Sequence, residues 1–387
     1  MVIPYGRQDI TEEDIESVAA VLRSDFITQG AAVDRFESDL VEKIGADYCV
    51  AVNSATSALY LGCRALGLAS GEYLWTSPIT FVASANCGLA CGAIIDFVDI
   101  NPNTFNICCD ALEEKLERAN KIGKLPKVLV VVQMAGASCD MRRIRDLADR
   151  YEFYIIEDAS HAIGGKFLGR YVGGCQFSDL SVFSFHPVKI ITTGEGGAVL
   201  TNNPKIAREV EMLRSHGVTR DSSLMSGAPS GPWVYHQIDF SLNFRLTDFQ
   251  AALGSSQLKR LDYLVEKRNF LSDRYINSFS ETGLEFQQID YEVYSSFHLF
   301  ILKIDEKKVG VSRHELYMHL KELGVMANVH YIPVHTQPFF SKKGFKPSDF
   351  PASIDYYSKA LTIPLFPTMG IEAQDYVINS VRSALPR

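Results

Sequence analysis

The sequence predicts an α/β fold in which a mostly parallel sheet forms a large domain and a smaller α+β domain follows it. Between about residues 47 and 200, short apolar runs alternate with amphipathic helical patterns. Such alternation is typical of a parallel sheet that is covered by helices on both faces. With 387 residues, 47% of them hydrophobic, the chain can also bury a large core.

The elements of the large domain follow one another in a regular order. Each predicted strand is a short apolar run, and each predicted helix carries apolar residues at helical spacing. The predicted strands are 48–53, 94–100, 127–134, 153–159, 181–185 and 197–203. The predicted helices between them are 54–68, 110–123 and 140–152.

The C-terminal part begins with a long helical pattern. Residues 246–279 run almost unbroken and exceed an ordinary globular helix, so we interpret them as a spine that joins two domains. This interpretation assigns residues 1–260 to the large domain and residues 261–387 to the small one. The predicted elements of the small domain are a strand at 295–304, a helix at 312–324, a strand that ends at 328–333 and a last helix near 371–385.

The composition argues against several classes of protein. Acidic residues outnumber basic ones by 46 to 38, the net charge is −8, and no long run of like charge occurs. A nucleic-acid partner is therefore not expected. The first residues lack the layout of a signal peptide, and no apolar run approaches the ~18 residues that indicate a membrane span. We expect a cytoplasmic protein.

Neither the cysteines nor the histidines form a metal-binding pattern. All eight cysteines lie between Cys49 and Cys175 without a CxxC pair, which favours reduced, structural thiols. His314 and His319 are five residues apart, and a helix turns such residues about 140° away from each other. We expect no metal site.

Polar residues that follow predicted strands are candidates for a binding site, because ligands of such sheets bind at the carboxyl ends of the strands. After the first strand, residues 53–59 read NSATSAL and open an Ala-rich helix. Free backbone N–H groups and the helix dipole there favour a phosphate. An ordinary N-cap at Ser54 or Thr56 explains the same residues.

Asp158 ends another predicted strand, and His161 follows three residues later. A buried carboxylate needs a cationic partner, but an Asp that caps the next helix and a histidine in the core explain these two residues as well. Phe81, within the stretch 76–86, follows a further strand end, and its residue type alone favours core packing.

Lys189 lies between the apolar run 181–185 and the Gly-rich turn 194–197, with Ser184 and His186 nearby. Fixing a lysine side chain costs entropy and burying it costs free energy, so Lys189 is either exposed to solvent or held for a function. Lysine forms Schiff bases with carbonyl compounds. A pyridoxal cofactor needs such a lysine, an acidic partner, an aromatic face and a phosphate cradle, and the strand ends supply all four.

Several motifs together resemble one family. SATSAL, TSPITFVAS, EDASHAIGG, FSFHPVKIITTGEGGAVLTN, LRSHGVTRD, NFRLTDFQAALG and VHYIPVHTQP occur in the order and approximate spacing of the DegT-type sugar aminotransferases. The resemblance covers nearly the whole chain and implies the aspartate-aminotransferase fold (fold type I) with pyridoxal 5'-phosphate (PLP) as cofactor. FHPVKIITTGEGG and LRSHG together resemble most the branch of pseudaminic acid biosynthesis. That branch aminates C4 of a UDP-linked 4-keto-6-deoxy-N-acetyl sugar, with L-glutamate as the expected amino donor.

The resemblance also implies roles for the residues around the cofactor ring. Lys189 would bond the cofactor covalently and then move protons as a base, and Asp158 would pair with the pyridine nitrogen. Phe81 would lie over the ring. His161 would lie beside the phenolic oxygen, where many relatives have glutamine.

The phosphate group has its own implied set of contacts. The backbone at Ala55 and Thr56 and the Ser184 hydroxyl would hold it within one subunit. Asn243 would reach the same phosphate from a second subunit, so the resemblance implies a homodimer with shared active sites.

The contacts of the sugar nucleotide are implied by further matching segments. They are Tyr5, Asp25, Phe26, Ile27, Thr28, His330 and Tyr331. Arg214, Arg220 and Arg245 offer positive charge for a diphosphate, although ordinary surface ion pairs explain them too. Met134 departs from the family pattern, since many relatives have histidine or tyrosine there, and we expect it to alter contacts near the cofactor.

Three alternatives remain open at the level of sequence. Another nucleotide sugar, linked to dTDP or GDP, is one possible substrate. A PLP sugar dehydratase of the same fold is the second, although the known dehydratase branch has histidine in place of the lysine that is present here. A binding or regulatory protein without catalysis is the third, because a fold does not fix a function.

Overall fold

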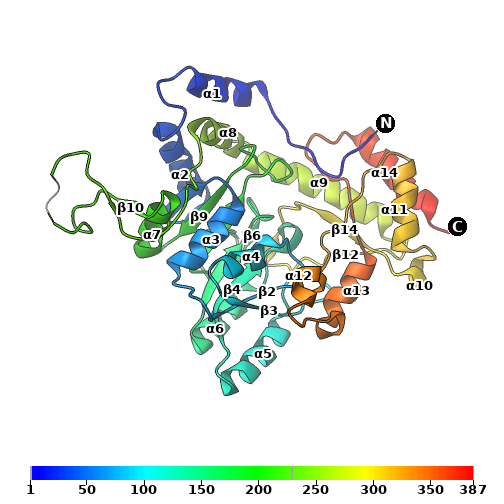
Figure 1. The fold of residues 1–387 in the computed structure, drawn as a ribbon. Helices are drawn as coiled ribbons and strands as arrows, with labels where there is room; N and C mark the ends of the chain where they lie inside the picture. The colour runs from blue at the N-terminus through cyan, green and yellow to red at the C-terminus, as the bar shows by residue number, and fades with distance from the viewer. Residues whose placement is uncertain (1, 228–229, 387) are drawn as a thin grey trace.

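The computed structural model describes residues 2–227 and 230–386 (Figure 1). A seven-stranded sheet forms its centre, with the strand order β1-β9-β8-β5-β4-β2-β3. Its strands are β1 (Tyr48–Val52), β2 (Tyr73–Thr76), β3 (Ile94–Phe97), β4 (Pro126–Val132), β5 (Tyr154–Asp158), β8 (Leu180–Ser184) and β9 (Gly197–Thr201). Only β9 runs antiparallel to its neighbours. The prediction of a mostly parallel sheet is confirmed.

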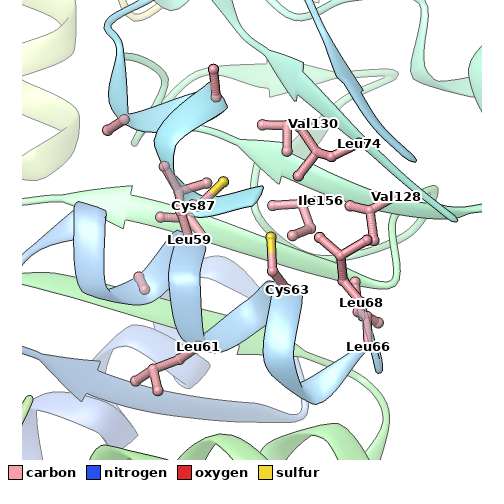
Figure 2. Packing of buried hydrophobic residues seen from close by; sticks show 14 of the residues in the cluster. Leu59, Leu61, Cys63, Leu66, Leu68, Leu74, Cys87, Val128, Val130 and Ile156 are labelled. Atoms are coloured by element: carbon pink, nitrogen blue, oxygen red, sulfur yellow. The ribbon is translucent and has the colours of Figure 1, made fainter. Parts of the chain in front are cut away.

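Helices cover both faces of this sheet. The helices of the large part are α2 (Ala31–Ile44), α3 (Ala55–Ala65), α4 (Ala83–Ala90), α5 (Cys109–Lys121), α6 (Met141–Tyr151) and α7 (Pro204–Arg214). Alternate strand residues point to opposite faces. Val128 and Val130 belong to the apolar cluster on the face that α3 and α4 cover (Figure 2), and α7 covers β1 and β9 on the same face. Leu129 and Val131 pack with α5 and α6 on the other face. β2 supplies the strand end that was expected before Phe81, whereas α4 was not predicted.

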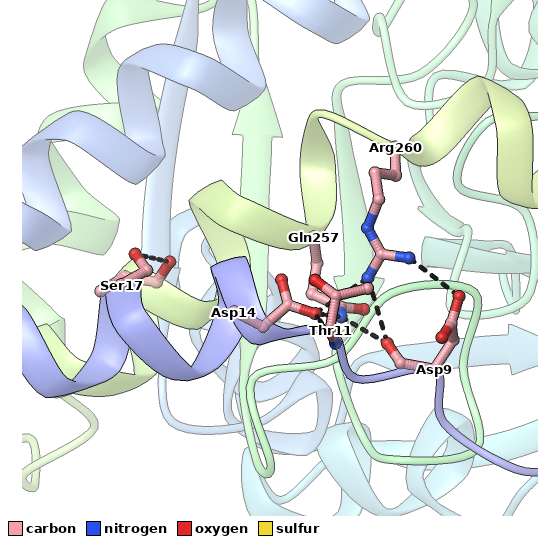
Figure 3. A network of polar contacts seen from close by, with 7 residues as sticks. Asp9, Thr11, Asp14, Ser17, Gln257 and Arg260 are labelled. Carbon is pink, nitrogen blue, oxygen red and sulfur yellow. Dashed lines mark hydrogen bonds and ion pairs between the residues drawn. The ribbon is translucent and has the colours of Figure 1, made fainter.

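The helical pattern at 246–279 is broken, so the prediction of one continuous spine is wrong. Two residues, Lys259 and Arg260, separate α8 (Asp248–Leu258) from α9 (Leu261–Phe279). The Arg260 guanidinium between them turns to the N-terminal segment, with Nη1 2.8 Å from Asp9 Oδ2 and Nη2 2.8 Å from Asp14 Oδ2 (Figure 3). Gln257 Nε2 donates to the same Asp14 oxygen at 2.6 Å. These contacts hold α1 (Glu12–Leu22) against α8 and fix the break.

The C-terminal part contains a second, antiparallel sheet. Its strands are β12 (Glu285–Phe286), β14 (Phe300–Lys303) and β15 (Ala360–Ile363), in the order β12-β14-β15. α11 (Arg313–Glu322) and α14 (Ile371–Ala384) confirm the two predicted helices, and one apolar cluster joins them to this sheet and to α9. The domain boundary at residues 260/261 stays a prediction.

The strand predicted to end at 328–333 is wrong. Its backbone forms a single bridge, between Asn328 and Thr362, and no further ladder. The His330 carbonyl instead accepts the hydroxyl hydrogen of Tyr356, and Pro333 has no N–H to donate. The segment therefore runs as irregular backbone beside β15.

The remaining elements are short. They are β6 (Lys166–Phe167), β7 (Arg170–Tyr171), β10 (Val218–Thr219), β11 (His236–Gln237), β13 (Val293–Tyr294), α10 (Glu306–Val309), α12 (Pro338–Ser341) and α13 (Pro351–Lys359). Among residues 2–227 and 230–386, no helix is both long enough and apolar enough to cross a membrane. The eight cysteines are free thiols.

Candidate active site

A cavity of about 420 Å³ lies at the carboxyl ends of β5 and β8. Segments far apart in the sequence line it, from the N-terminal segment to the irregular segment at 328–333. The predicted site residues that line it are Tyr5, Ala55, Thr56, Phe81, Asp158, His161, Ser184, Lys189, His330 and Tyr331. The structure therefore brings most of the predicted site together in one place.

Lys189 lies in the loop between β8 and β9 and is half-buried. Its backbone N–H donates to the His186 carbonyl at 2.9 Å, which forms a turn directly after the strand. Burial lowers the pKa of Lys189 to about 8, and the nearby Asp158 carboxylate opposes this shift. An amine with this pKa is partly neutral near physiological pH and can act as a nucleophile or a base.

Asp158 ends β5 and is only 5% exposed. Its Oδ2 accepts the Ser84 hydroxyl at 2.8 Å, and Ser84 in turn lies 2.7 Å from Thr80 Oγ1. Its Oδ1 accepts the Ser160 backbone N–H at 3.2 Å. A turn follows Asp158, so the alternative that it caps a helix is excluded. These hydrogen bonds orient a carboxylate at the edge of the cavity.

The N-terminus of α3 forms one wall of the cavity. Ser54 is its N-cap and accepts the Ser57 N–H at 3.1 Å, which leaves the first backbone N–H groups of the helix, at Ala55 and Thr56, for a ligand. Gly197, the first residue of β9, lies so close that an added Cβ would be 2.5 Å from the Ala55 nitrogen. Only glycine fits at this position. The N-terminus of α3, the positive end of its dipole, therefore lies against β9 and lines the cavity, as an anion site requires.

His161 and Tyr331 form a buried polar pair. His161 Nε2 lies 3.0 Å from the Tyr331 hydroxyl, and His161 Nδ1 accepts the Ala135 backbone N–H at 3.3 Å. Burial, together with the charges of Lys189 and His330, holds the pKa of His161 well below its usual value. The imidazole is therefore neutral.

His298 is a lining residue that sequence reasoning missed. Its ring centroid lies 4.5 Å from that of His161, and its Nδ1 is buried without a hydrogen-bond partner among the described residues. Ser84 and Thr80, which bond towards Asp158, were missed as well. The signal for His298 was a titratable side chain in the middle of the apolar run 295–304.

Several predicted site residues lie elsewhere. Asn243 is exposed and does not line the cavity, and the same holds for the loop from Asp25 to Thr28. Met134 is 1% exposed and packs in a separate apolar cluster with Ile79 and Phe105. Its side chain does not line the cavity, so the expectation that it alters contacts there is not met within this chain.

The diphosphate role expected for Arg214 is wrong. Its Nη1 forms an ion pair with Glu37 at 2.5 Å and donates to the Ala51 carbonyl at 3.0 Å. Both side chains are largely buried, so the guanidinium is committed to the packing of α7 against α2 and β1. Arg245 donates to the Ser215 hydroxyl at 3.0 Å.

The lining of the cavity fits PLP. It offers a lysine of lowered pKa, a buried carboxylate, the exposed ring of Phe81 and a helix N-terminus that suits a phosphate. When bound, PLP supplies a carbonyl that reacts with amines and a ring that accepts electrons. Lys189 Nζ is placed to move a proton, while Asp158 is placed to hold one on a basic nitrogen nearby.

Comparison with known proteins agrees with this geometry. Residues 8–382 match the profile of the DegT/DnrJ/EryC1/StrS aminotransferase family. The chain is 36% identical over 383 residues to the spore coat polysaccharide biosynthesis protein SpsC of Bacillus subtilis, covering 98% of this chain and 96% of the relative. It is 36% identical over 390 residues to the UDP-4-amino-4,6-dideoxy-N-acetyl-beta-L-altrosamine transaminase of Campylobacter jejuni, covering 100% and 98%.

Solved structures are similar over almost the full length. PseC of Helicobacter pylori, an aminotransferase involved in the biosynthesis of pseudoaminic acid, superposes with a TM-score of 0.89 at 30% identity, covering 99% of each chain. A putative sugar aminotransferase of Streptococcus pneumoniae in its PLP form gives 0.88 at 29% identity, covering 99% and 98%. The chain thus belongs to the DegT/DnrJ/EryC1/StrS aminotransferase family and is an aminotransferase with pyridoxal phosphate as its cofactor.

Proposed function

We propose that this enzyme transfers an amino group from L-glutamate to C4 of a UDP-linked 4-keto-6-deoxy-N-acetylhexosamine, as in the biosynthesis of pseudaminic acid. The observation that carries the proposal is the cavity in which Lys189 and Asp158 meet, in a chain 36% identical to a Campylobacter jejuni transaminase of such a sugar. The similarity to PseC supports the same pathway.

Each wall of the cavity has a distinct task in this proposal. Lys189 would hold the cofactor and serve as the base that moves protons, while Asp158 would pair with the ring nitrogen. Phe81 would supply the aromatic face. The backbone of Ala55 and Thr56, with the Ser184 hydroxyl at the end of β8, would hold the phosphate.

In this proposal the keto sugar contacts Tyr5, His330 and Tyr331, polar residues that line the same cavity. Burial, and then the charge of Lys189, lowers the pKa of His330 to about 3, so this imidazole is neutral. Its Nδ1 lies 2.9 Å from the Thr362 hydroxyl, which fixes the ring.

We also propose a homodimer with shared active sites. Asn243 of one subunit would contact the phosphate in the other, together with the loop from Asp25 to Thr28 on the sugar side. Large apolar side chains near both segments are exposed, among them Phe26 at 64%, Phe240 at 66% and Leu242 at 53%. Clusters of such side chains commonly mark contacts between proteins.

The substrate is tested by offering a set of keto sugars to the purified enzyme with L-glutamate. The set comprises the two UDP-linked 2-acetamido-4-keto-6-deoxyhexoses of the L-arabino and D-xylo series and a dTDP-4-keto-6-deoxyglucose control. We expect the highest kcat/KM with the L-arabino sugar. A preference for the dTDP sugar would refute the UDP assignment, and a preference for the xylo epimer would refute the pathway but not the transamination.

A different nucleotide-linked keto sugar is the second candidate. The identity to SpsC of Bacillus subtilis is the same 36% as that to the Campylobacter jejuni enzyme. A preference for the dTDP control in the same experiment would favour this second candidate.

A further inference from the structure

The polarity of the hydrogen bond between His161 and Tyr331 is fixed by the backbone. The Ala135 N–H donates to His161 Nδ1 at 3.3 Å, and a backbone N–H has no other role than donor. Nδ1 therefore carries no hydrogen. In a neutral imidazole the hydrogen then resides on Nε2, which donates to the Tyr331 oxygen 3.0 Å away.

This arrangement leaves the hydrogen of the Tyr331 hydroxyl free. The oxygen already accepts from His161, and no acceptor for the hydroxyl hydrogen is found among the described residues. Tyr331 lines the cavity that also holds Lys189. The free hydrogen therefore has only a bound ligand or water to meet.

The surroundings keep both groups in these protonation states. Burial and the neighbouring Lys189 and His330 lower the pKa of His161 well below its usual value. Burial, with a further contribution from Asp158, raises the pKa of Tyr331. The adjacent imidazole of His298 has a strongly lowered pKa for the same reasons of burial and positive charge. Lys189, with a pKa of about 8, titrates near neutral pH, but burial is the larger cause of the low pKa of His161 and keeps that imidazole neutral.

We propose that Tyr331 is a one-way hydrogen-bond donor to the oxygen on the reacting carbon of the substrate, with His161 as the positioning residue that sets this direction. The proposal rests on the proposed function, since it takes that oxygen to be the C4 keto oxygen. This hydrogen bond would let the site discriminate between the keto sugar and the amino sugar.

The consequence is discrimination between substrate and product at the reacting carbon. A keto oxygen only accepts hydrogen bonds, and the ammonium group that replaces it only donates them. A hydroxyl with fixed outward polarity therefore binds the keto sugar and repels the amino sugar. Product leaves more readily, and the keto substrate competes with it more effectively.

The test measures a ratio, the inhibition constant of the amino-sugar product divided by the KM of the keto sugar. In Tyr331→Phe this ratio should fall about tenfold, the effect of one hydrogen bond lost from the substrate. His161→Gln, whose amide can still donate, should retain the wild-type ratio. His161→Glu, which can only accept when ionised, turns the Tyr331 hydroxyl inward, and the ratio should fall at least as far as in Tyr331→Phe. Tyr60→Phe, a tyrosine bonded to Arg64 outside the cavity, is the matched control.

A second readout needs no turnover. Nitrogen-15 NMR of the holoenzyme labelled at histidine should show His161 neutral, with its hydrogen on Nε2. A hydrogen on Nδ1 would overturn the proposal whatever the substrate. An unchanged ratio in Tyr331→Phe would also overturn the proposal. If the visible absorbance of that variant shifts while the ratio stays the same, the hydroxyl hydrogen bonds to the cofactor and not to the substrate. Lack of turnover of every keto sugar by the wild type would refute the proposed function and the sugar as ligand, while the NMR result would still decide the polarity.

Discussion

Among single residues, Lys189 has the largest expected effect on catalysis. Lys189→Ala should lower kcat by at least about 100- to 10,000-fold, which is the typical contribution of one acid or base. The loss should exceed that range, because the proposed covalent link to the cofactor is removed as well. Lys121→Ala, an exposed lysine at the end of α5, is the control. Turnover with the sugar nucleotide and circular dichroism are measured together, and a folded variant with near wild-type turnover would contradict the assignment.

Asp158→Asn separates cofactor binding from catalysis. The amide keeps the shape of the side chain and can still bond to Ser84, so the variant should bind PLP. It should lose most of kcat, because an amide does not hold a proton on the ring nitrogen as a carboxylate does. Absorbance gives PLP occupancy and a coupled assay gives kcat. An unchanged kcat would mean that Asp158 only orders the turn after β5.

The pH dependence of cofactor capture follows from the pKa of Lys189. Only the neutral amine reacts with a carbonyl, and burial lowers its pKa to about 8 against the usual 10.5. The rate at which the apoprotein captures PLP should therefore rise with pH up to about 8 and then level off. In Asp158→Asn this inflection should move to lower pH, because the carboxylate raises the pKa of Lys189. Stopped-flow absorbance across a pH series measures both curves, and an inflection near 10 would contradict the burial of Lys189.

Single residues also show how far the sequence could predict the site. Lys189, Asp158 and His161 could be selected because each lies at or just after a strand end, a position that the apolar pattern reveals, and all three line the cavity. His298 was missed, since a histidine inside an apolar run has no spacing that distinguishes it. The diphosphate role of Arg214 was wrong because its partner, Glu37, lies 177 residues away in the sequence, and no local pattern reports such a pair.

At the level of elements, the break between α8 and α9 depends on the ion pairs of Arg260. Its partner Asp14 is 1% exposed, so Arg260→Ala would leave a buried carboxylate without its cation. We expect the free energy of unfolding to fall by about 3 kcal/mol. The control is Arg150→Ala in α6, whose ion pair with Glu113 is exposed to solvent and whose loss should cost far less. Urea unfolding of both variants tests this, and equal costs would show that the network does not hold the break.

The same break explains a limit of prediction from sequence. Helical spacing in residues 246–279 continues across Lys259 and Arg260, so the pattern alone predicts one helix. The interruption arises from contacts with Asp9 and Asp14, which belong to a distant segment. The strand expected at 328–333 failed for a related reason, since Tyr356 takes the carbonyl of His330 that a neighbouring strand would need.

At the level of the whole molecule, the proposed sharing of active sites predicts complementation. Lys189→Ala and Asn243→Ala subunits, unfolded together and refolded in equal amounts, should form hybrids in about half of the dimers, each with one intact site. The mixture should then recover about a quarter of wild-type activity, although the Lys189→Ala parent is inactive. Light scattering establishes the assembly state. An active monomer, or a mixture no more active than its parents, would contradict the shared site.

The overall architecture was predictable where it depends on pattern, and the assembly was not. Alternating apolar strands and amphipathic helices identified the central sheet, because its buried strands must be apolar on both faces. The exposed side chains of Phe26, Phe240 and Leu242 could not be distinguished from core residues, since apolar composition alone does not tell an interior from a surface patch.

The course of the first residues has a practical consequence for how the protein is produced. Ile3 forms a parallel bridge with Val325 and is buried in the C-terminal apolar cluster. Two residues later, the Tyr5 carbonyl accepts the Leu365 N–H at 3.1 Å, and Tyr5 itself lines the cavity. A purification tag fused ahead of Val2 would thus be attached to a segment that shapes the substrate pocket. The described residues after α14 do not line the cavity, so a tag intended for kinetics or crystallisation should be placed there.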